Sequence, residues 1–405
     1  MSRVVRLEEI EDQLRALTVP PVVLVGQCPH GLAILRGFAK RGIPVYAIES
    51  NYQQSSARSR FGVKLHCPSL DGPELLDLLV AIGRRAARKP LLLVTNDRMV
   101  RLLNPEQGRL RAWYHIPFPD PDILTRLIDK EPLAELARSR GLRIPTTLIV
   151  ESSADVARAG EAVRYPCILK PAMPMSSFKV LLIPDEGSLT RAIDTYPDIK
   201  RFIIQSWVAG ADRNIFFVAY YFGSDGRVLA TFAGQKIRQY PRTLGNTSAA
   251  RGVDRPDLVR EGHKLFENLG YKGIASVEFK LGPEGEPHFI EATVGRTDYW
   301  YQTLPANGVD LLYAVYEDLA LGRPAPAATQ RNRKIWVDVD RDWEVYVESF
   351  LDPDVSKGDL FRFLLAPKEL ALFDWNDPTP CLHWAPRFVG RVLAKIASRL
   401  KCFGR

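Results

Sequence analysis

Apolar runs of strand length alternate with amphipathic segments of helix length in the first domain, residues 1–125. PVVLVG, IPVYAIES and PLLLVTND are the strand-like runs, and HGLAILRGFAKRG and PELLDLLVAIGRRAARK have the 3.6-residue apolar period of helices. Strands joined by crossover helices predict a parallel, doubly wound sheet of the α/β class. The turn after the first strand reads GQCPHG rather than GxGxxG, which disfavours a dinucleotide-dependent dehydrogenase.

The pattern becomes α+β over residues 126–200 and changes to long antiparallel strands over residues 201–325. In the first of these units, the helix IDKEPLAELARSRGL ends at Gly141, and three strands, IPTTLIV, YPCILKPA and VLLIPD, surround the loop MPMSSFK. In the second, three strands follow in succession, with GSDG as a hairpin turn: RFIIQSWV, NIFFVAYYF and RVLATFAGQKI. We therefore expect a small lid beside a larger antiparallel sheet.

A Pro/Ala-rich linker, GRPAPAATQ, introduces a C-terminal appendage, residues 326–405. The appendage contains the strand KIWVDVD and a helix expected over residues 387–401. One stripe of this helix is basic, with Arg387, Arg391, Lys395 and Arg399, and the other face is apolar, with Phe388, Val392, Leu393, Ile396 and Leu400. Such a helix either docks its apolar face on the protein's own core, leaving a solvated basic face, or lies on an anionic membrane at its inner face.

Composition is that of an ordinary globular protein with an excess of positive charge. The 405 residues carry 55 basic and 47 acidic side chains, a net charge of +8 that suits an enzyme acting on polyanions such as nucleotides, although general Arg enrichment explains it equally well. No apolar run reaches transmembrane length, and the N-terminus has no secretory signal. The five cysteines are widely spaced without a CxxC, so we expect a reducing, cytoplasmic location. The positive charge would also suit a membrane surface or a nucleic acid, although no nucleic-acid partner is expected.

Two glutamates stand near the ends of neighbouring strand-like segments. Glu278 lies in IASVEFKL and Glu291 in EPHFIEAT, and the Gly/Pro-rich LGPEGEP between them predicts a β-hairpin. Two carboxylates on neighbouring strands can hold one or two Mg²⁺ ions and leave positions open for phosphate oxygens. Magnesium together with the spaced lysines upstream, Lys130, Lys170 and Lys179, is the equipment of an ATP site.

These elements, in this order, resemble the ATP-grasp superfamily of carboxylate–amine and carboxylate–thiol ligases over roughly residues 20–325. Asp129-Lys130 opens a helix that ends in a Gly-Leu-x-x-Pro turn, as in the family, and Lys170-Pro171 ends the following strand. The resemblance implies that Lys130 reaches a phosphate oxygen and that Lys170 lies against the α- and β-phosphates. A lysine at the end of an apolar strand is otherwise costly, because a buried ammonium needs an anionic partner.

The same resemblance assigns the remaining nucleotide contacts. MPMSSFK corresponds to the loop that closes over the phosphates, although it has no glycine, and implies contacts from Ser176, Ser177 and Lys179. The adenine hinge corresponds to residues 205–208, where Gln205 replaces the family's Glu and is followed by Trp207 and Val208. Asp212 replaces the family's ribose-binding acid, and Trp207 packs either on the base or in the core.

The metal and acceptor residues also follow from the resemblance. Glu278 and Glu291 match the two acidic metal ligands, and Thr293 stands where the family has a metal-binding Asn. The basic residues implied to steady the acyl phosphate, and hence to be catalytic, are Arg296, Lys236 and Arg238.

The implied fold is an N-terminal Rossmann-like parallel-sheet domain followed by a two-lobed ATP-grasp fold with antiparallel sheets. The implied activity uses ATP with Mg²⁺ or Mn²⁺ to activate a small-molecule carboxylate as an acyl phosphate and joins it to an amine or a thiol. Many relatives are dimers, so a homodimer is expected. Three alternatives remain: a phosphotransferase acting on a hydroxyl, a weakly catalytic nucleotide-binding scaffold, and a peripheral membrane protein.

Overall fold

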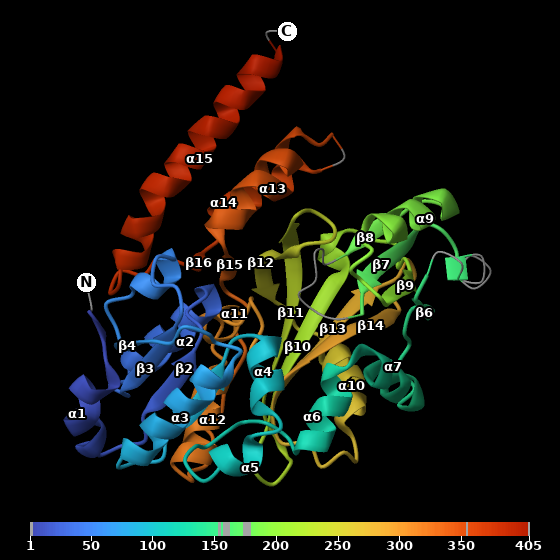
Figure 1. Ribbon diagram of the computed structural model, residues 1–405. Coiled ribbons are helices and arrows are strands. Elements are labelled where there is room, and N and C mark those ends of the chain that lie inside the picture. Colours follow the sequence, from blue (N-terminus) through green and yellow to red (C-terminus); the bar gives the residue numbers. More distant parts are fainter. Residues whose placement is uncertain (1–2, 153–154, 157–162, 173–179, 354, 404–405) are drawn as a thin grey trace.

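The computed structural model describes residues 3–152, 155–156, 163–172, 180–353 and 355–403. Its N-terminal unit is a five-stranded sheet in which all neighbours are parallel, in the order β1-β4-β3-β2-β5 (Figure 1). The strands are β1 (Val4–Val5), β2 (Val22–Val25), β3 (Val45–Glu49), β4 (Val63–His66) and β5 (Leu91–Val94). The predicted parallel, doubly wound sheet is confirmed.

Both faces of this sheet are covered, as the residues of β2 show: alternate residues of this strand belong to two different core clusters. Val23 and Val25 pack in one cluster and Val22 and Leu24 in the other, as expected for strands buried on both sides. The helices and turns of this part are η1 (Leu7–Ile10), α1 (Glu11–Arg15), α2 (Pro29–Ala39), η2 (Ser55–Arg58), α3 (Pro73–Arg85), α4 (Asp97–Leu103), α5 (Gln107–Leu110), α6 (Pro121–Ile128) and α7 (Lys130–Ser139).

The lid is a four-stranded antiparallel sheet in the order β6-β9-β7-β8. Its elements are β6 (Thr147–Val150), β7 (Cys167–Pro171), β8 (Leu181–Ile183), α9 (Glu186–Thr195) and β9 (Phe202–Ser206). The placement of β9 in the third unit was wrong, because β9 pairs with β6 and β7 of the lid. The chain therefore leaves the lid only after Ser206, at the hinge.

The central sheet has seven strands in the order β14-β13-β10-β11-β12-β15-β16. Its strands are β10 (Ile215–Phe222), β11 (Val228–Tyr240), β12 (Asn246–Gly252), β13 (Gly273–Leu281), β14 (Pro287–Val294), β15 (Ile335–Val337) and β16 (Lys368–Leu370). The last two come from the segment predicted to be a separate appendage, and β15 pairs with β12. This segment therefore extends the central sheet rather than forming a unit of its own.

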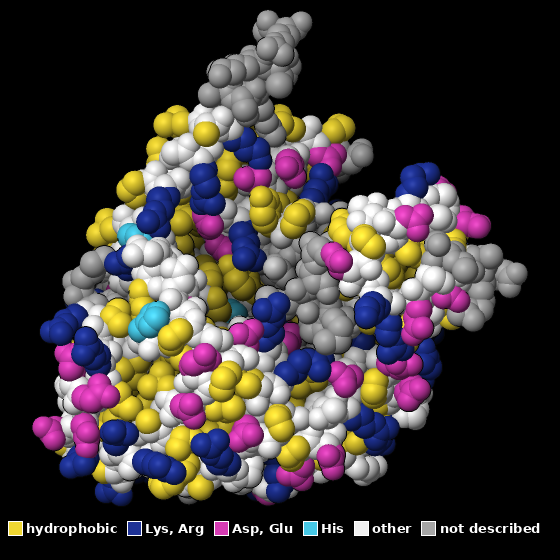
Figure 2. Space-filling model, in the orientation of Figure 1, with side chains coloured by type: hydrophobic (Ala, Val, Ile, Leu, Met, Phe, Trp, Pro, Cys, Tyr) yellow, Lys and Arg dark blue, Asp and Glu magenta, His cyan; other side chains and the backbone are white. Residues whose placement is uncertain are grey.

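The remaining helices lie around this sheet and beyond it. They are η4 (Asp212–Asn214), α10 (Pro256–His263), η5 (Lys264–Phe266), α11 (Thr303–Ala306), α12 (Leu311–Val315), the π-helical turn η6 (Tyr316–Ala320), α13 (Val339–Leu351), α14 (Lys357–Leu365) and α15 (Thr379–Phe403). Charged side chains of both signs are spread over the visible face of the molecule (Figure 2).

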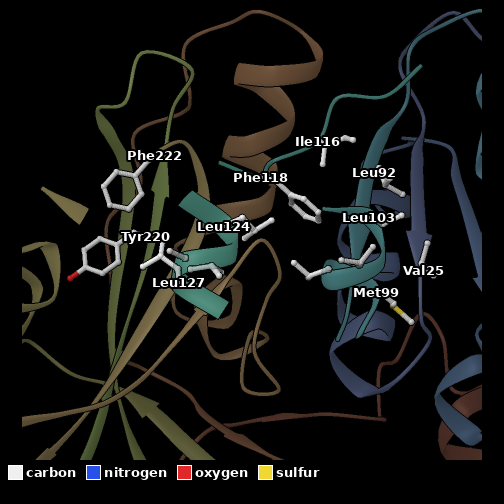
Figure 3. Close-up of a cluster of buried hydrophobic side chains, with 14 of the residues drawn as sticks. Val25, Leu92, Met99, Leu103, Ile116, Phe118, Leu124, Leu127, Tyr220 and Phe222 are labelled. Carbon is white, nitrogen blue, oxygen red and sulfur yellow. The ribbon is translucent and has the colours of Figure 1, made fainter. Parts of the chain in front are cut away.

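The largest core cluster joins the N-terminal unit to the central sheet. It extends from Val25 and Leu92 in the parallel sheet to Tyr220 and Phe222 on β10. Figure 3 shows Leu124 and Leu127 of α6 beside Tyr220, and Phe118 between α6 and the parallel sheet. Because these buried contacts are continuous, the two units have no independent cores, and the edge of one sheet is fixed relative to the other.

The C-terminal helix α15 begins earlier than predicted, at Thr379, and projects from the body of the molecule (Figure 1). Its orientation also differs from the alternative in which the apolar face packs on the protein's own core and the basic face is exposed to solvent. Arg391 and Lys395 form ion pairs with Asp340 and Glu344 of α13, whereas Leu393 of the apolar face is 61% exposed. Within the described residues, no helix is long and apolar enough to span a bilayer.

Candidate functional site

A cavity of about 190 Å³ lies between the lid sheet and the central sheet. Helix α7, strands β7 and β9 of the lid, and strands β11, β13 and β14 of the central sheet all contribute to its lining. It brings together eight of the residues predicted from the sequence: Lys130, Lys170, Gln205, Trp207, Val208, Lys236, Glu278 and Glu291.

The acidic pair is placed by the register of the predicted hairpin, in which Glu278 on β13 faces Glu291 on β14. Glu278 is buried, and its Oε2 accepts a hydrogen bond of 2.7 Å from the Nζ of Lys236 on β11. Trp300 Nε1 donates to the other carboxylate oxygen at 3.4 Å. Burial raises the pKa of Glu278, and the neighbouring Glu291 and Asp298 carboxylates add to this effect, which Lys236 opposes.

Lys236 responds in the complementary way. Burial alone would lower the pKa of its ammonium, but the negative charges of Glu278 and Glu291 outweigh it and raise the pKa. Lys236 therefore carries a positive charge beside the two carboxylates. A metal ion bound there would add further positive charge.

The donor set at this pair fits a hard divalent cation. Within the described residues, no cluster of three or more His, Cys, Asp or Glu side chains has metal-binding geometry. Two carboxylates on adjacent strands are nevertheless the arrangement by which Mg²⁺ is held when water and substrate phosphates complete its coordination. Mn²⁺ accepts the same oxygen ligands.

Two lysines line the lid side of the cavity, and one of them contacts the hinge, residues 205–208. Lys130, the first residue of α7, donates to the carbonyl oxygen of Pro171 at 2.8 Å. Lys170 on β7 donates to Gln205 Oε1 at 3.0 Å, and Gln205 Nε2 donates to Thr147 Oγ1 at 3.1 Å. Gln205 on β9 thus links β7, through Lys170, to β6, through Thr147. Its amide oxygen already accepts a hydrogen bond from Lys170.

A further lysine lines the cavity next to Trp207. Lys280 lies on β13 two residues after Glu278, and successive odd or even positions of a strand share a face. Its Nζ lies 3.6 Å from the centre of the Trp207 ring. Burial lowers the pKa of Lys280 to about 8, although Asp212 opposes the shift. Trp207 therefore lines the cavity, packed against a cation.

Asp212, predicted to bind ribose, does not line the cavity. Its carboxylate accepts hydrogen bonds from the backbone N–H and side-chain amide of Gln239 and from the N–H of Thr243. These contacts fix the loop between β11 and β12, whose residues Thr243 to Gly245 line the cavity.

Thr293, predicted as a third metal ligand, donates its hydroxyl hydrogen to Asp298 Oδ1 at 2.8 Å. Ser276, opposite Thr293 in the register, donates to the other oxygen of Asp298. Asp298 therefore adds a third carboxylate near the Glu278–Glu291 pair, and the sequence motifs did not indicate it.

Arg296 is held by the N-terminal unit. Its Nε and Nη2 donate to the two carboxylate oxygens of Asp97 at 2.5 and 3.0 Å, and its Nη1 lies 3.6 Å from Asp298 Oδ1. Asp97 is the first residue of α4, immediately beyond the carboxyl end of β5. Burial alone would raise the pKa of Asp97, but the Arg296 guanidinium lowers it. The bidentate pair fixes the direction of this guanidinium.

Comparisons with known proteins find relatives at low sequence identity. No family model matches the chain. A D-aspartate ligase from Enterococcus faecium (strain Aus0004) is 23% identical over 282 residues, which are 63% of this chain and 66% of that enzyme. The chain thus spans slightly less than two thirds of that relative. A tetraacyldisaccharide 4'-kinase from Chromobacterium violaceum is 24% identical over 353 residues, 85% of this chain and 84% of that protein.

Solved structures identify the fold. The N5-carboxyaminoimidazole synthetase from Staphylococcus aureus complexed with ADP superposes with a TM-score of 0.62 at 13% identity, covering 77% of this chain and 80% of that one. Biotin carboxylase from Campylobacter jejuni gives 0.61 at 13% identity, covering 76% and 73%. Both are ATP-grasp enzymes. The chain has the ATP-grasp fold.

Within the ATP-grasp fold, Arg238 lies apart from the site. Its guanidinium donates to both carboxylate oxygens of Asp342 on α13, at 2.8 and 2.5 Å, and lies 3.9 Å from the centre of the Phe363 ring. A β-bulge in β11 between Lys236 and Arg238 explains the separation, because it breaks the alternation that would put both on one face. The geometry gives Arg238 a packing role rather than the predicted catalytic one.

The loop expected to cover the phosphates in an ATP-grasp enzyme, with Ser176, Ser177 and Lys179, lies outside the described residues. Among the described residues, sequence reasoning missed Lys280, which lines the cavity. It also missed Asp97 and Asp298, the carboxylates that hold Arg296; these three residues lie outside the cavity lining. Strand alternation after Glu278 was the available signal for Lys280. Asp97 had none, because only the tertiary structure brings it to Arg296. Asp298 lies two residues after Arg296, but no motif marked it as part of the site.

Proposed function

We propose that the protein is an ATP- and Mg²⁺-dependent ligase that activates a small-molecule carboxylate as an acyl phosphate and joins it to an amine or, less often, a thiol. The observation that carries the proposal is the pair of buried Glu278 and exposed Glu291, facing one cavity together with Lys130, Lys170 and the hinge. The match to a D-aspartate ligase supports an amino acid as one substrate.

The residues that line the cavity, and Arg296 and Asp97 outside its lining, have distinct roles in this proposal. Residues 205–208 bind the base, and Lys130 and Lys170 bind phosphate oxygens. Glu278 and Glu291 would hold Mg²⁺, which would neutralise charge on the phosphates. Lys236 balances the carboxylates, and Arg296, directed by Asp97, binds the acyl phosphate.

The chemistry then requires positioning more than a protein nucleophile. An oxygen of the substrate carboxylate attacks the γ-phosphorus, the bond to ADP breaks, and an acyl phosphate forms. The amine nitrogen attacks the acyl carbon, phosphate leaves, and the nitrogen loses a proton. Arg296 stabilises the negative charge that spreads over the acyl phosphate. Such electrostatic stabilisation, together with positioning of the reactants, accounts for most of the catalysis in this mechanism.

Trapping the acyl phosphate tests the proposal. The protein is incubated with ATP, Mg²⁺, hydroxylamine and a panel of carboxylates that includes D- and L-amino acids. We expect a hydroxamate and ADP in equal amounts with at least one carboxylate, and their loss in Glu291→Gln. Glu284→Gln, an exposed acid in the hairpin turn, is the matched control and should retain activity. ADP formation without hydroxamate across the panel would contradict acyl-phosphate chemistry.

A phosphotransferase acting on a hydroxyl is the second candidate. The match to a 4'-kinase covers 85% of this chain, more than the D-aspartate ligase match does, and favours it. The same lysines and carboxylates serve this reaction, since both begin with attack on the γ-phosphorus. Transfer of labelled γ-phosphate to a hydroxyl acceptor, with no hydroxamate from any carboxylate, would select this reaction over ligation.

A further inference from the structure

A cysteine and a histidine lie together at the start of α2, outside the lining of the cavity. Cys28 is the N-cap residue of α2, and its Sγ lies 3.3 Å from Nδ1 and 3.5 Å from Nε2 of His30. His30 is buried, whereas Cys28 is partly exposed. Both residues belong to the turn GQCPHG, which follows β2 at the carboxyl edge of the parallel sheet, the edge at which open α/β sheets bind ligands.

The hydrogen bonds of His30 decide which of its nitrogens can take a proton. Nε2 lies 3.0 Å from the carbonyl oxygen of Thr95, which can only accept, so Nε2 carries the hydrogen. In the neutral ring Nδ1 is then the acceptor, and Nδ1 is the nitrogen nearer to the thiol of Cys28. The arrangement has the three parts of an activated nucleophile: a thiol, a base beside it, and a group that orients the base.

The thiol stands where its charged form is favoured. Burial alone would raise the pKa of Cys28, but His30 and hydrogen bonds with the Gly31 backbone and the Thr95 side chain lower it. The N-terminus of α2, a helix of 11 residues, adds a dipole that favours a thiolate. The other partly exposed cysteine of the described residues, Cys381, has its pKa raised by burial.

The other polar groups near the pair are occupied with one another. Tyr299 Oη donates to Asp338 Oδ2 at 2.5 Å, and the guanidinium of Arg341 lies 4.3 Å from the centre of the Tyr299 ring. Burial and the charge of Asp338 raise the pKa of Tyr299, so its hydroxyl keeps its proton. His30 is therefore the base that faces Cys28.

One short segment, from Arg296 to Trp300, links this pair to the proposed ATP site. Arg296 is the residue proposed to bind the acyl phosphate. Three residues later, the ring of Tyr299 meets the His30 ring edge-on, with centroids 5.8 Å apart. Trp300 Nε1 donates to Glu278 of the carboxylate pair. The thiol and the acyl-phosphate site are thus attached to the same five residues.

The residue before Cys28 offers an acceptor to a ligand. Gln27 is fully buried, and within the described part of the chain its Oε1 has no hydrogen-bond partner. A buried oxygen without a donor costs free energy, so such groups in folded proteins are usually satisfied. The N–H of an amine substrate would supply the donor, in the same turn as the thiol.

We propose that Cys28 carries the acyl group as a thioester, with His30 as its base. The sulfur attacks the acyl carbon of the acyl phosphate, the C–S bond forms, the C–O bond to phosphate breaks, and His30 Nδ1 takes the thiol proton. The amine nitrogen then attacks the thioester carbon, the C–N bond forms, the C–S bond breaks, and a proton from the amine returns to the sulfur through His30. This step rests on the proposed function and inserts a thioester between its two stages.

Alkylation by iodoacetamide tests the thiol and its base without ATP. Mass spectrometry of the full chain gives the rate at each cysteine. At pH 7 we expect Cys28 to react at least about tenfold faster than Cys381. His30→Gln should slow Cys28 about tenfold at pH 7 and little near pH 10, where the thiol ionises without a base. Equal rates at Cys28 and Cys381, or an unchanged rate in His30→Gln, would overturn the proposal.

Acyl transfer is tested first with p-nitrophenyl acetate and then with ATP. Acid-quenched protein should carry an acetyl group on Cys28 that hydroxylamine removes. With ATP, Mg²⁺ and the carboxylate panel but no amine, the acyl group should appear on Cys28 for those carboxylates that give a hydroxamate in a parallel incubation. Hydroxamate without a thioester on Cys28 would overturn the thioester and leave the ligase. Acetylation by the ester with no hydroxamate from any carboxylate would overturn the ligase instead.

Two variants complete the test. Cys28→Ala should lose the thioester and form the amide at least about a hundredfold more slowly, with ATP affinity unchanged. Cys381→Ala is the matched control and should keep both. Amide formation at the full rate by folded Cys28→Ala would overturn the proposal. The adduct on the unmodified protein decides the question should Cys28→Ala fail to fold.

Discussion

Burial disfavours the charged forms of Glu278 and Lys280 in the cavity, whereas the neighbouring carboxylates favour the charged form of Lys236. Glu278 and Lys236 are both buried and stabilise each other across 2.7 Å. Lys280 is buried beside Trp207 with a lowered pKa. Buried charges of this kind reduce stability unless they are paired, and they concentrate at sites where a charged ligand binds.

Lys280→Met should raise the stability of the protein at pH 7 and weaken nucleotide binding. Below about pH 8 the folded protein must hold a buried ammonium, a cost of about 1–3 kcal/mol that methionine removes. Between pH 8 and 10.5 the folded protein loses this proton before the unfolded chain does, so the difference between the two proteins should shrink as pH rises. Thermal unfolding measured from pH 7 to pH 10 tests this.

Lys272→Met is the control, because Lys272 is exposed just before β13. A Lys280→Met protein less stable than the unmodified protein at pH 7, with unchanged ATP affinity, would show that the lysine is a structural residue. We expect instead about a tenfold loss of affinity, the scale of a lost charge-assisted contact.

At the scale of elements, the sequence pattern predicted the strands, helices and turns that depend on neighbouring residues. The Gly/Pro turn predicted the hairpin that carries Glu278 and Glu291. The register near the turn would put Glu278 opposite Ile290, and the shift between Glu278 and Phe279 brings Glu291 opposite it instead. The parallel sheet followed from strands alternating with helices. The motif order then placed Lys130 and Lys170 correctly in the same cavity.

Pairing between distant strands could not be predicted from the sequence. β9 has a clear strand pattern, but nothing local shows that its neighbours are β6 and β7. The linker before β15 suggested a separate unit, yet β15 joins the central sheet. The bulge in β11 is likewise invisible in the pattern, and it explains why Arg238, which the resemblance assigned to the site, lies apart from it.

Asp342→Asn should destabilise the protein without affecting the reaction directly. Asp342 on α13 accepts from Arg238 and Ser248 and is buried, so the substitution leaves an uncompensated guanidinium. We expect a loss of about 3–5 kcal/mol in the free energy of unfolding, measured by denaturant titration. Asp359→Asn, at an exposed site on α14, should change little. Normal stability with lost turnover would instead support the catalytic role first assigned to Arg238.

At the scale of the molecule, the site is assembled from every unit. The lid provides Lys170 and the hinge, the central sheet provides the carboxylates, and the N-terminal unit provides Asp97 through α4. The continuous core around α6 fixes the N-terminal unit against the central sheet. The buried ion pair of Arg36 on α2 with Asp377 fixes the start of α15 against the N-terminal unit.

Asp97→Asn tests whether the N-terminal unit takes part in the reaction. Asparagine keeps the shape of the side chain but removes the charge that directs Arg296, so turnover should fall by about tenfold to a hundredfold with ATP affinity unchanged. Steady-state kinetics and calorimetry on the same preparation separate the two effects. Asp71→Asn, which removes an exposed ion pair with Arg98, is the control. Equal losses in turnover and ATP affinity would mean that Arg296 serves nucleotide binding instead.

The most direct test of the central claim is calorimetric titration of ATP with and without Mg²⁺, on the unmodified protein, Glu291→Gln and the control Glu284→Gln. The account predicts that Mg²⁺ strengthens binding to the unmodified protein and to the control. In Glu291→Gln the affinity for MgATP should fall by about tenfold or more, a loss of at least about 1.4 kcal/mol. Equal affinity in all three proteins, or no binding of ATP by the folded unmodified protein, would contradict a metal-dependent nucleotide site at Glu278 and Glu291.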